Sequence, residues 1–327
     1  MPKPLGVPLR LAQAGQIVAP VCLMALLRSN DALNGLNALA ADPKTIVAIE
    51  IDRDSRGKNA PRVVAVATPE SAIIIDAAAT PALGAALAKH DRAYAAVGAK
   101  QIHRSFLKRG ETQLPARWAC AVMTELLLLG GRRGSTEADA IALRYIGTPL
   151  PSADASLVSL GDRARAIARV VAAQVPKLRE DDLVSVSKLE AAAVAPIAAL
   201  EHTGMPFDAP QWRMIDKGVR EELEGIRNEV AALLGSGKDL FGAAQVNLDS
   251  DVELKKALHA RGYKVENTRR DTVLRFVPTP LGPMLARYRE LTKLASAYGT
   301  TFLDLASDDG RLRPTFEQIG SSTGRMA

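Results

Sequence analysis

The first half of the chain changes from short β-branched runs to longer segments in which apolar residues have helical spacing. Runs rich in Val and Ile, separated by Gly, Pro and Asn, predict three strands: Thr45–Ile51, Arg62–Ala67 and Ala72–Ile75. Apolar positions then recur every three or four residues and predict helices at Thr80–Lys89, Ile102–Arg109, Ala116–Leu129, Thr136–Tyr145 and Leu160–Val175. The strands are close enough in sequence for an antiparallel meander, and helices packed against such a sheet indicate an α+β or α/β domain.

The second half is predicted to be mainly helical. A helix over Leu183–Glu201 has one apolar face, made of Leu189, Ala193, Ile197 and Leu200. A long amphipathic helix then begins at Asp208, which has the capping-box partner Gln211 three residues later, while Phe207 and Trp212 are placed as a hydrophobic staple. We attribute the apolar stripe of this helix to packing; it consists of Ile215, Val219, Leu223, Ile226, Val230 and Leu233.

Two more helices follow, separated by a basic stretch. In Val246–Gly262 a helix is capped by Ser250 with Glu253, and Gly262 ends it; a longer helix covers Leu281–Ala306. The basic side chains of this region are Lys255, Lys256, Arg261, Lys264, Arg269, Arg270 and Arg275. These charges are equally consistent with an arm that binds duplex nucleic acid and with an ordinary solvent-exposed protein surface.

Composition narrows the class of protein without identifying it. The 327 residues suffice for two domains, and 47% hydrophobic with 24% charged residues is typical of a soluble globular chain. A net charge of +6 weakly favours a polyanionic partner, and the presence of only two cysteines indicates a reducing compartment. The apolar run Ile17–Leu27 is too short to cross a bilayer. We interpret it as a strand near Ile17–Met24 before a small helix that ends at Asp42, with a signal peptide as the less favoured alternative.

One pair of carboxylates on the first predicted strand could carry chemistry. Glu50 and Asp52 are two residues apart, so on a strand both side chains point to the same face. Two convergent carboxylates can hold a divalent metal. The alternative is a strand end that carries two solvated acids.

The segment around this pair, VAIEIDRDSRG (Val47–Gly57), resembles the first motif of the proofreading exonuclease domain of family A DNA polymerases. That motif is Asp-x-Glu, and here the order is reversed. At the family's second motif, Ala99 and His103 stand where Asn and Asp would be; at the third, Arg163 falls on the Asp position, with Asp162 one residue out of register. Two-metal hydrolysis needs several carboxylates. The resemblance therefore implies an RNase H-like exonuclease-type domain whose proofreading site is vestigial and holds no metal.

Four motifs in the second half resemble the polymerase module of the same family, in the family's order. They are ALEHTGMPFD (Ala199–Asp208), VNLDSDVELKKAL (Val246–Leu258), RYRELTKLASAY (Arg287–Tyr298) and DGRLRPTFEQIGSSTGRMA (Asp309–Ala327). The resemblance implies that six residues contact primer–template DNA: Asn247, Ser250, Lys293, Arg313, Thr323 and Arg325. An Arg at position 325 would sense correct pairing in the minor groove, whose acceptors are alike in every pair.

The resemblance covers nearly the whole chain and implies its organisation. We expect a degenerate α/β exonuclease-like domain at residues 1–182, a mainly α thumb-like domain at 183–308 and the first strands of a palm domain at 309–327. The family's palm carboxylates and fingers residues would follow Thr-Gly-Arg, so we expect this chain to be a front part that does not polymerise DNA by itself. Mg²⁺ would be expected for a complete family member, but no cofactor for this chain.

The leading hypothesis is therefore the front part of a DNA polymerase for replication or repair, whose partners are double-stranded primer–template DNA and the remaining polymerase part. We expect a cytoplasmic location, at the nucleoid if the source is bacterial, and no membrane partner. Two alternatives stay open: a stand-alone DNA-binding protein without catalysis, and a metal-dependent exonuclease with a rearranged site around Glu50, Asp52 and His103.

Overall fold

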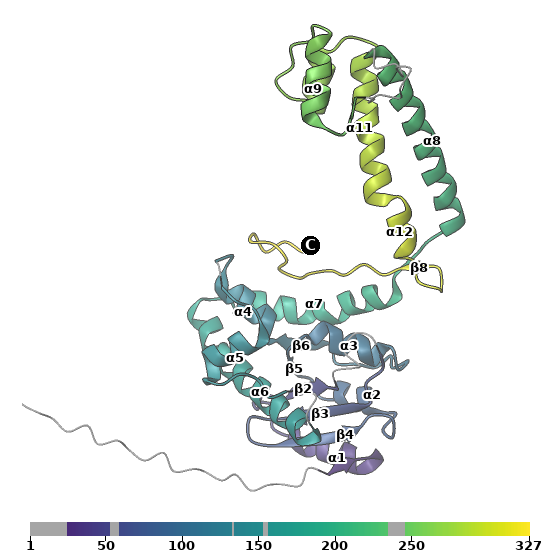
Figure 1. The fold of residues 1–327 in the computed structure, drawn as a ribbon. Coiled ribbons are helices and arrows are strands. Elements are labelled where there is room, and N and C mark those ends of the chain that lie inside the picture. The colour runs from purple at the N-terminus through teal and green to yellow at the C-terminus, as the bar shows by residue number, and fades with distance from the viewer. Residues whose placement is uncertain (1–24, 53–58, 133, 153–155, 235–245) are drawn as a thin grey trace, which may run out of the picture. The chain divides into compact units, whose positions relative to one another are not determined.

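The computed structural model describes residues 25–52, 59–132, 134–152, 156–234 and 246–327 (Figure 1). The chain forms two compact units. The first comprises Met1–Ala199 together with Phe316–Ala327, and the second comprises Leu200–Thr315. The strand that we predicted near Ile17–Met24, as well as Cys22, lies outside the described residues.

A six-stranded mixed sheet, in the order β1-β4-β3-β2-β5-β6, forms the centre of the first unit. Its strands are β1 (Leu26–Leu27), β2 (Ala48–Ile51), β3 (Val63–Ala67), β4 (Ala72–Asp76), β5 (Ala93–Ala96) and β6 (Arg117–Cys120). Strands β2, β3 and β4 form the predicted antiparallel meander. Strand β1 pairs in parallel with β4, β5 with β2, and β6 with β5.

Helices cover both faces of this sheet. They are α1 (Ser29–Leu39), α2 (Leu83–Ala88), α3 (Ala99–Leu107), α4 (Ala121–Leu129), α5 (Ala138–Ile146), α6 (Leu157–Glu180) and α7 (Val184–Thr203). One buried cluster joins Ile49 and Ile51 of β2 to apolar residues of α1, α2 and α3, and a second joins Ala48 to α5 and α6. Because side chains alternate along a strand, Glu50 is directed towards the same face as Ala48, the face of α6.

Two sequence predictions for the first unit need correction. The helix predicted over Ala116–Leu129 begins only at Ala121, because Arg117–Cys120 forms β6 beside β5. The apolar face predicted for α7 is also wrong in part, since Leu189 and Leu200 are exposed while Ile197 is buried. Strand β5 was not predicted at all, because its Ala-Tyr-Ala-Ala sequence carries little β propensity.

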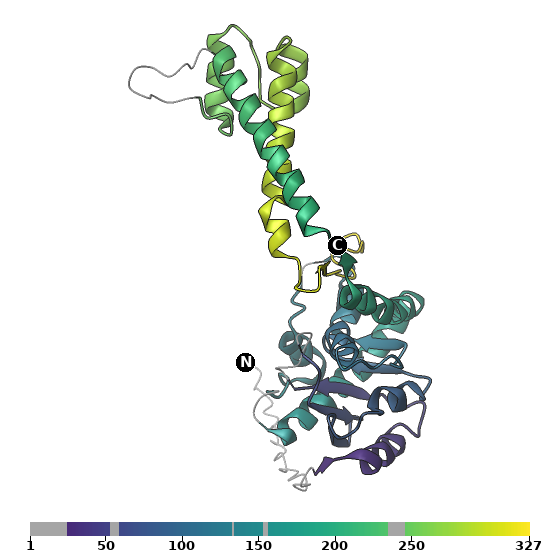
Figure 2. The same ribbon diagram turned by 90° about the vertical axis from the view of Figure 1, so that its right-hand side faces the viewer.

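The second unit is a pair of long helices with two smaller helices packed at one end and a short helix at the other (Figure 2). Its elements are α8 (Ala209–Leu233), α9 (Asp251–Ala260), α10 (Arg270–Phe276), α11 (Leu281–Tyr298), α12 (Thr300–Asp304) and the short strands β7 (Met205–Pro206) and β8 (Arg311–Leu312). Helices α8 and α11 run side by side, and α9 and α10 share a buried core with them. The helix predicted over Leu281–Ala306 is interrupted at Gly299, where a side chain would collide with the carbonyl of Ala295.

The predicted caps of the second unit are confirmed. Asp208 Oδ1 accepts a hydrogen bond from the backbone amide of Gln211 at 2.9 Å. The rings of Phe207 and Trp212 lie 5.7 Å apart, as a hydrophobic staple requires. The stripe of α8 is only partly packed, because Val230 is buried whereas Ile215 is 48% exposed.

Within the described parts of the chain, none of the helices combines the length and apolar character needed to span a membrane.

Candidate nucleic-acid interface

Both carboxylates of the predicted pair, Glu50 on β2 and Asp52 directly after it, have partners within the protein. Glu50 is fully buried, and its Oε2 lies 3.1 Å from Nε of Arg163 on α6. Asp52 Oδ1 accepts hydrogen bonds from the backbone amides of Arg62 and Val63, both at 2.9 Å. Arg163 also donates to the carbonyl of Pro151 at 2.9 Å, so its guanidinium is fixed beside Glu50. A guanidinium in this place repels a divalent ion, and these residues do not fit the metal that such a pair could otherwise bind.

His103, which the sequence analysis considered as part of a rearranged exonuclease site, is buried and hydrogen-bonded within the protein. Its Nδ1 accepts a hydrogen bond from the indole Nε1 of Trp118 at 3.0 Å, and the two rings meet edge to face at 5.9 Å. Burial lowers the pKa of His103 to about 4, so the ring is neutral near pH 7. Among the described residues, no group of three or more His, Cys, Asp or Glu side chains could hold a metal ion.

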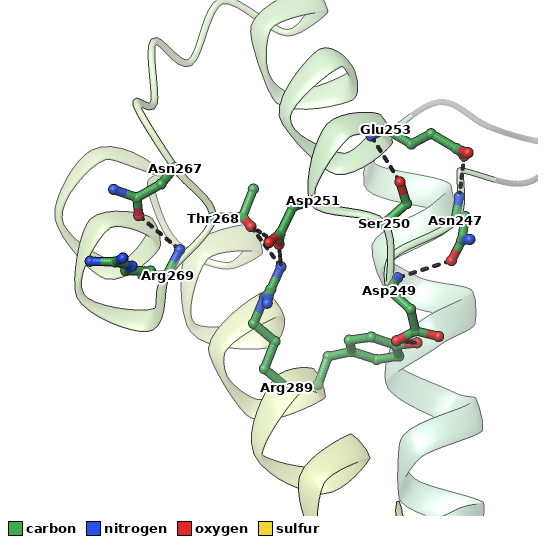
Figure 3. A network of polar contacts seen from close by, with 10 residues as sticks. Asn247, Asp249, Ser250, Asp251, Glu253, Asn267, Thr268, Arg269 and Arg289 are labelled. Atoms are coloured by element: carbon green, nitrogen blue, oxygen red, sulfur yellow. Dashed lines mark hydrogen bonds and ion pairs between the residues drawn. The ribbon is translucent and has the colours of Figure 1, made fainter. Parts of the chain in front are cut away.

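Asn247 and Ser250 lie together at the start of α9 (Figure 3). Ser250 Oγ accepts from the backbone amide of Glu253 at 3.4 Å, and the Glu253 carboxylate accepts from the backbone amide of Asn247 at 3.1 Å. Asn247 Oδ1 accepts from the backbone amide of Asp249 at 3.0 Å. The side-chain oxygens therefore shape the turn, while the Ser hydroxyl and the Asn amide group retain hydrogens that can be donated to a phosphate oxygen.

A second segment, the loop before α10, is joined to the start of α9 by Arg289 of α11. Arg289 Nη2 donates to Asp251 Oδ1 at 2.6 Å and to Thr268 Oγ1 at 2.7 Å, and the Thr268 hydroxyl donates to Asp251 (Figure 3). These hydrogen bonds, that from Thr268 first, lower the pKa of Asp251 below its ordinary value. The sequence did not reveal this connection, because its three members are separated by 17 and 21 residues.

The surface around these two segments carries a modest positive excess. Residues 246–277 contain seven Lys and Arg against five Asp and Glu. Six of the basic side chains are exposed: Lys256, Arg261, Lys264, Arg269, Arg270 and Arg275. The seventh, Lys255, donates to the carbonyl of Glu266 at 2.9 Å. The predicted basic stretch thus lies on α9, α10 and the loop that connects them.

Lys293 and Arg313, the other two candidates of the second unit, differ in their availability. Lys293 is exposed on α11. Arg313 is engaged: its guanidinium pairs with both carboxylate oxygens of Asp309 at 2.9 and 2.6 Å, and its Nε donates to the carbonyl of His202 at 2.9 Å. This pairing lowers the pKa of Asp309. A phosphate at Arg313 would have to compete with a bidentate partner.

Thr323 and Arg325 belong to the first unit. Ser321 Oγ accepts from the backbone amide of Arg325 at 2.9 Å and lies 3.1 Å from the Thr323 hydroxyl. The segment that bears them is held by Gln318, whose amide donates to the carboxylate and carbonyl of Glu190 on α7 at 2.7 and 3.2 Å. The Arg325 residue is exposed. The six candidates therefore form separate groups in two units, and the role of Gln318 was not visible in the sequence.

Comparisons with known proteins agree with this architecture. The chain is 27% identical to DNA polymerase I of Helicobacter pylori (strain J99) over 154 residues, which are 45% of this chain and 16% of the relative. It is 28% identical to the thermostable DNA polymerase I of Thermus aquaticus over 201 residues, 59% of this chain and 23% of the relative. The chain thus spans less than a quarter of the length of these relatives. No family model matches it.

Among solved structures, the POL domain of Pol1 from M. smegmatis, in complex with DNA primer–template and dNTP, superposes with a TM-score of 0.71. The match covers 92% of this chain and 54% of that one at 20% identity, so it establishes the fold. The motifs, the sequence relatives and this fold agree with one another, and the chain is a DNA polymerase I-like protein over the part that it shares with them.

Proposed function

We propose that the chain is the front part of a family A DNA polymerase and binds primer–template duplex DNA through the second unit. In this proposal residues 1–182 are an RNase H-like exonuclease-type domain, 183–308 a thumb and 309–327 the first part of a palm. This proposal rests on one observation. Two polar segments, Asn247–Ser250 and Asn267–Arg269, come together among exposed Lys and Arg side chains.

The chemistry of this surface suits a phosphate backbone. Helix α9 begins at Asp251, so its first amides, the Ser250 hydroxyl and the Asn247 amide group offer donors in one place. The negative charges of Asp249 and Asp251 repel an anion at the start of α9, and the exposed basic side chains nearby compensate for this repulsion. Contacts of this kind position a duplex without reading its sequence, which is the mode of binding that a polymerase requires.

In the same proposal the exonuclease-like domain is a scaffold rather than a nuclease. Two-metal hydrolysis needs carboxylates that hold ions roughly 3.5–4 Å apart, whereas Glu50 pairs with Arg163 and Asp52 accepts backbone amides. We expect no release of nucleotides from single-stranded or duplex DNA with Mg²⁺ or Mn²⁺. Metal-dependent release that disappears in Glu50→Ala would favour the rearranged exonuclease instead.

The binding proposal is tested by a salt titration of a labelled primer–template hairpin, measured by fluorescence anisotropy. In the variant Arg269→Ala/Arg270→Ala, affinity should fall and the slope of log K against log salt should decrease by about 1.8 if both side chains contact phosphates, since each contributes about 0.9. A matched control is Arg213→Ala/Lys217→Ala on α8, which removes the same charge from another part of the unit. Absence of binding at low salt, or equal losses in both variants, would contradict the proposal.

A further inference from the structure

We propose that Arg289 is a positioning residue that holds the two DNA-facing segments of the second unit in one fixed arrangement. The inference rests on the proposed function, since it concerns how that surface is organised. It assigns Arg289 no contact with DNA. Its role is exerted through Asp251 at the start of α9 and Thr268 before α10.

The geometry is that of a three-membered polar junction (Figure 3). One nitrogen of Arg289, Nη2, lies 2.6 Å from Asp251 Oδ1 and 2.7 Å from Thr268 Oγ1, and the Thr268 hydroxyl donates to the same carboxylate oxygen. Thr268 is only 2% exposed, so the junction lies beneath the surface on one side. Three elements distant in sequence, α9, the loop and α11, are thereby fixed at one point.

Each arm of the junction ends beside a candidate phosphate contact. Asp251 follows Ser250 directly, and Ser250 is the N-cap of α9. Thr268 is flanked by Asn267, whose Oδ1 accepts from the backbone amide of Arg269 at 3.0 Å. The spacing between the Ser250 and Arg269 segments therefore depends on the three contacts of this junction, two of which are made by Arg289. A charge-assisted hydrogen bond is shorter and stronger than a neutral one, which suits a group that must fix a geometry.

Removing the charge of Asp251 distinguishes this positioning role from simple electrostatic repulsion of DNA. If Asp251 acted on DNA only through its negative charge, Asp251→Asn would strengthen binding by removing a repulsion. If Asp251 holds the surface together with Arg289, the same substitution weakens binding. The two readings predict opposite signs for one measurement.

The experiment measures hairpin affinity over a salt series for Arg289→Met, Arg289→Lys, Asp251→Asn and the double variant Arg289→Met/Asp251→Asn. The matched control is Arg287→Met, on the same helix, which loses an ion pair to Glu222 (2.7 Å). Hydrogen exchange of the backbone amides at 250–254 and 267–271 is measured on each variant without DNA. Circular dichroism identifies any variant that fails to fold.

We expect Arg289→Met to weaken binding about tenfold, equivalent to ~1.4 kcal/mol, with faster exchange in both amide segments. The salt slope should change by much less than the roughly 0.9 of a lost phosphate contact. Asp251→Asn should weaken binding too, the double variant should be no worse than Arg289→Met, Arg289→Lys should recover most of the affinity, and Arg287→Met should remain near wild type.

Several outcomes would overturn the inference. They are tighter binding by Asp251→Asn, a salt slope reduced by about one contact in Arg289→Met, and equal behaviour of Arg289→Met and Arg287→Met. If the wild-type chain binds no duplex, the proposed function fails. The exchange data then decide separately whether Arg289 orders the two segments.

Discussion

The ion pair between Glu50 and Arg163 makes a strong and quantitative prediction about stability. Glu50 is fully buried on β2, and the Arg163 side chain is 12% exposed, so both charges have left most of their water. Removing one partner of such a pair leaves an uncompensated buried charge, which typically costs about 3–5 kcal/mol. We therefore expect Arg163→Met to lower the free energy of unfolding of the first unit by about that amount, or its Tm by roughly 6–20 °C.

The matched control is Arg165→Met on the same helix. Arg165 pairs with Asp162 one turn away, and both side chains of that pair are about a third exposed, at 30% and 36%. Partly exposed pairs of this kind contribute about 0–1 kcal/mol. The double variant Glu50→Gln/Arg163→Met, which removes both charges, should recover most of the stability lost in Arg163→Met, because no charge remains buried.

The assay is urea denaturation followed by tryptophan fluorescence. Trp118 is buried in the first unit and Trp212 lies in the second, so a Trp212→Phe background reports on the first unit. A cost for Arg163→Met no larger than that for Arg165→Met would refute the reasoning. So would a double variant less stable than Arg163→Met, because the pair would then contribute more than the relief of a buried charge.

Three further predictions concern single groups. Burial lowers the pKa of His103 to about 4, so between about pH 6.5 and 4 only the imidazole of the unfolded chain gains a proton. The first unit should therefore lose stability as the pH falls through this range. Denaturation of His103→Asn, measured as a function of pH, should lack this loss. Asp208→Ala should destabilise the second unit by about 1 kcal/mol, measured by thermal denaturation, because the N-cap of α8 is lost. Gly204 has φ +67, and a Cβ there would lie 2.6 Å from the Leu312 carbonyl, so Gly204→Ala should lower the melting temperature of the second unit, whereas the exposed Gly218→Ala should not.

Sequence reasoning succeeded where the determining contacts are local. The caps at Asp208 and Ser250 depend on residues three positions away, and both were identified correctly. The meander was also predicted, because its strands are β-branched and consecutive. Strands β5 and β6 were not: they are short and Ala-containing, and their strand conformation is set by pairing with β2 and with each other.

The sequence proposed candidate residues for the site, and it did not indicate the contacts that connect them. The sequence motifs drew attention to Glu50 and Arg163, but gave no indication that the two side chains pair across 113 residues. Arg289 joins Asp251 to Thr268, a connection that the sequence did not indicate. Long-range polar contacts depend on the packing of whole elements, and hydrophobic periodicity carries no information about them.

The short β7–β8 ladder has a consequence for how this molecule can be divided. Met205 pairs with Leu312 and Pro206 with Arg311, and the Phe207 amide donates to the Gly310 carbonyl at 2.9 Å. The chain therefore enters and leaves the helical unit at adjacent positions, so residues 207–310 are in effect the enlarged loop of a β-hairpin. Such a segment can be gained, lost or exchanged as a module, because its two ends already meet where a tight turn would join them.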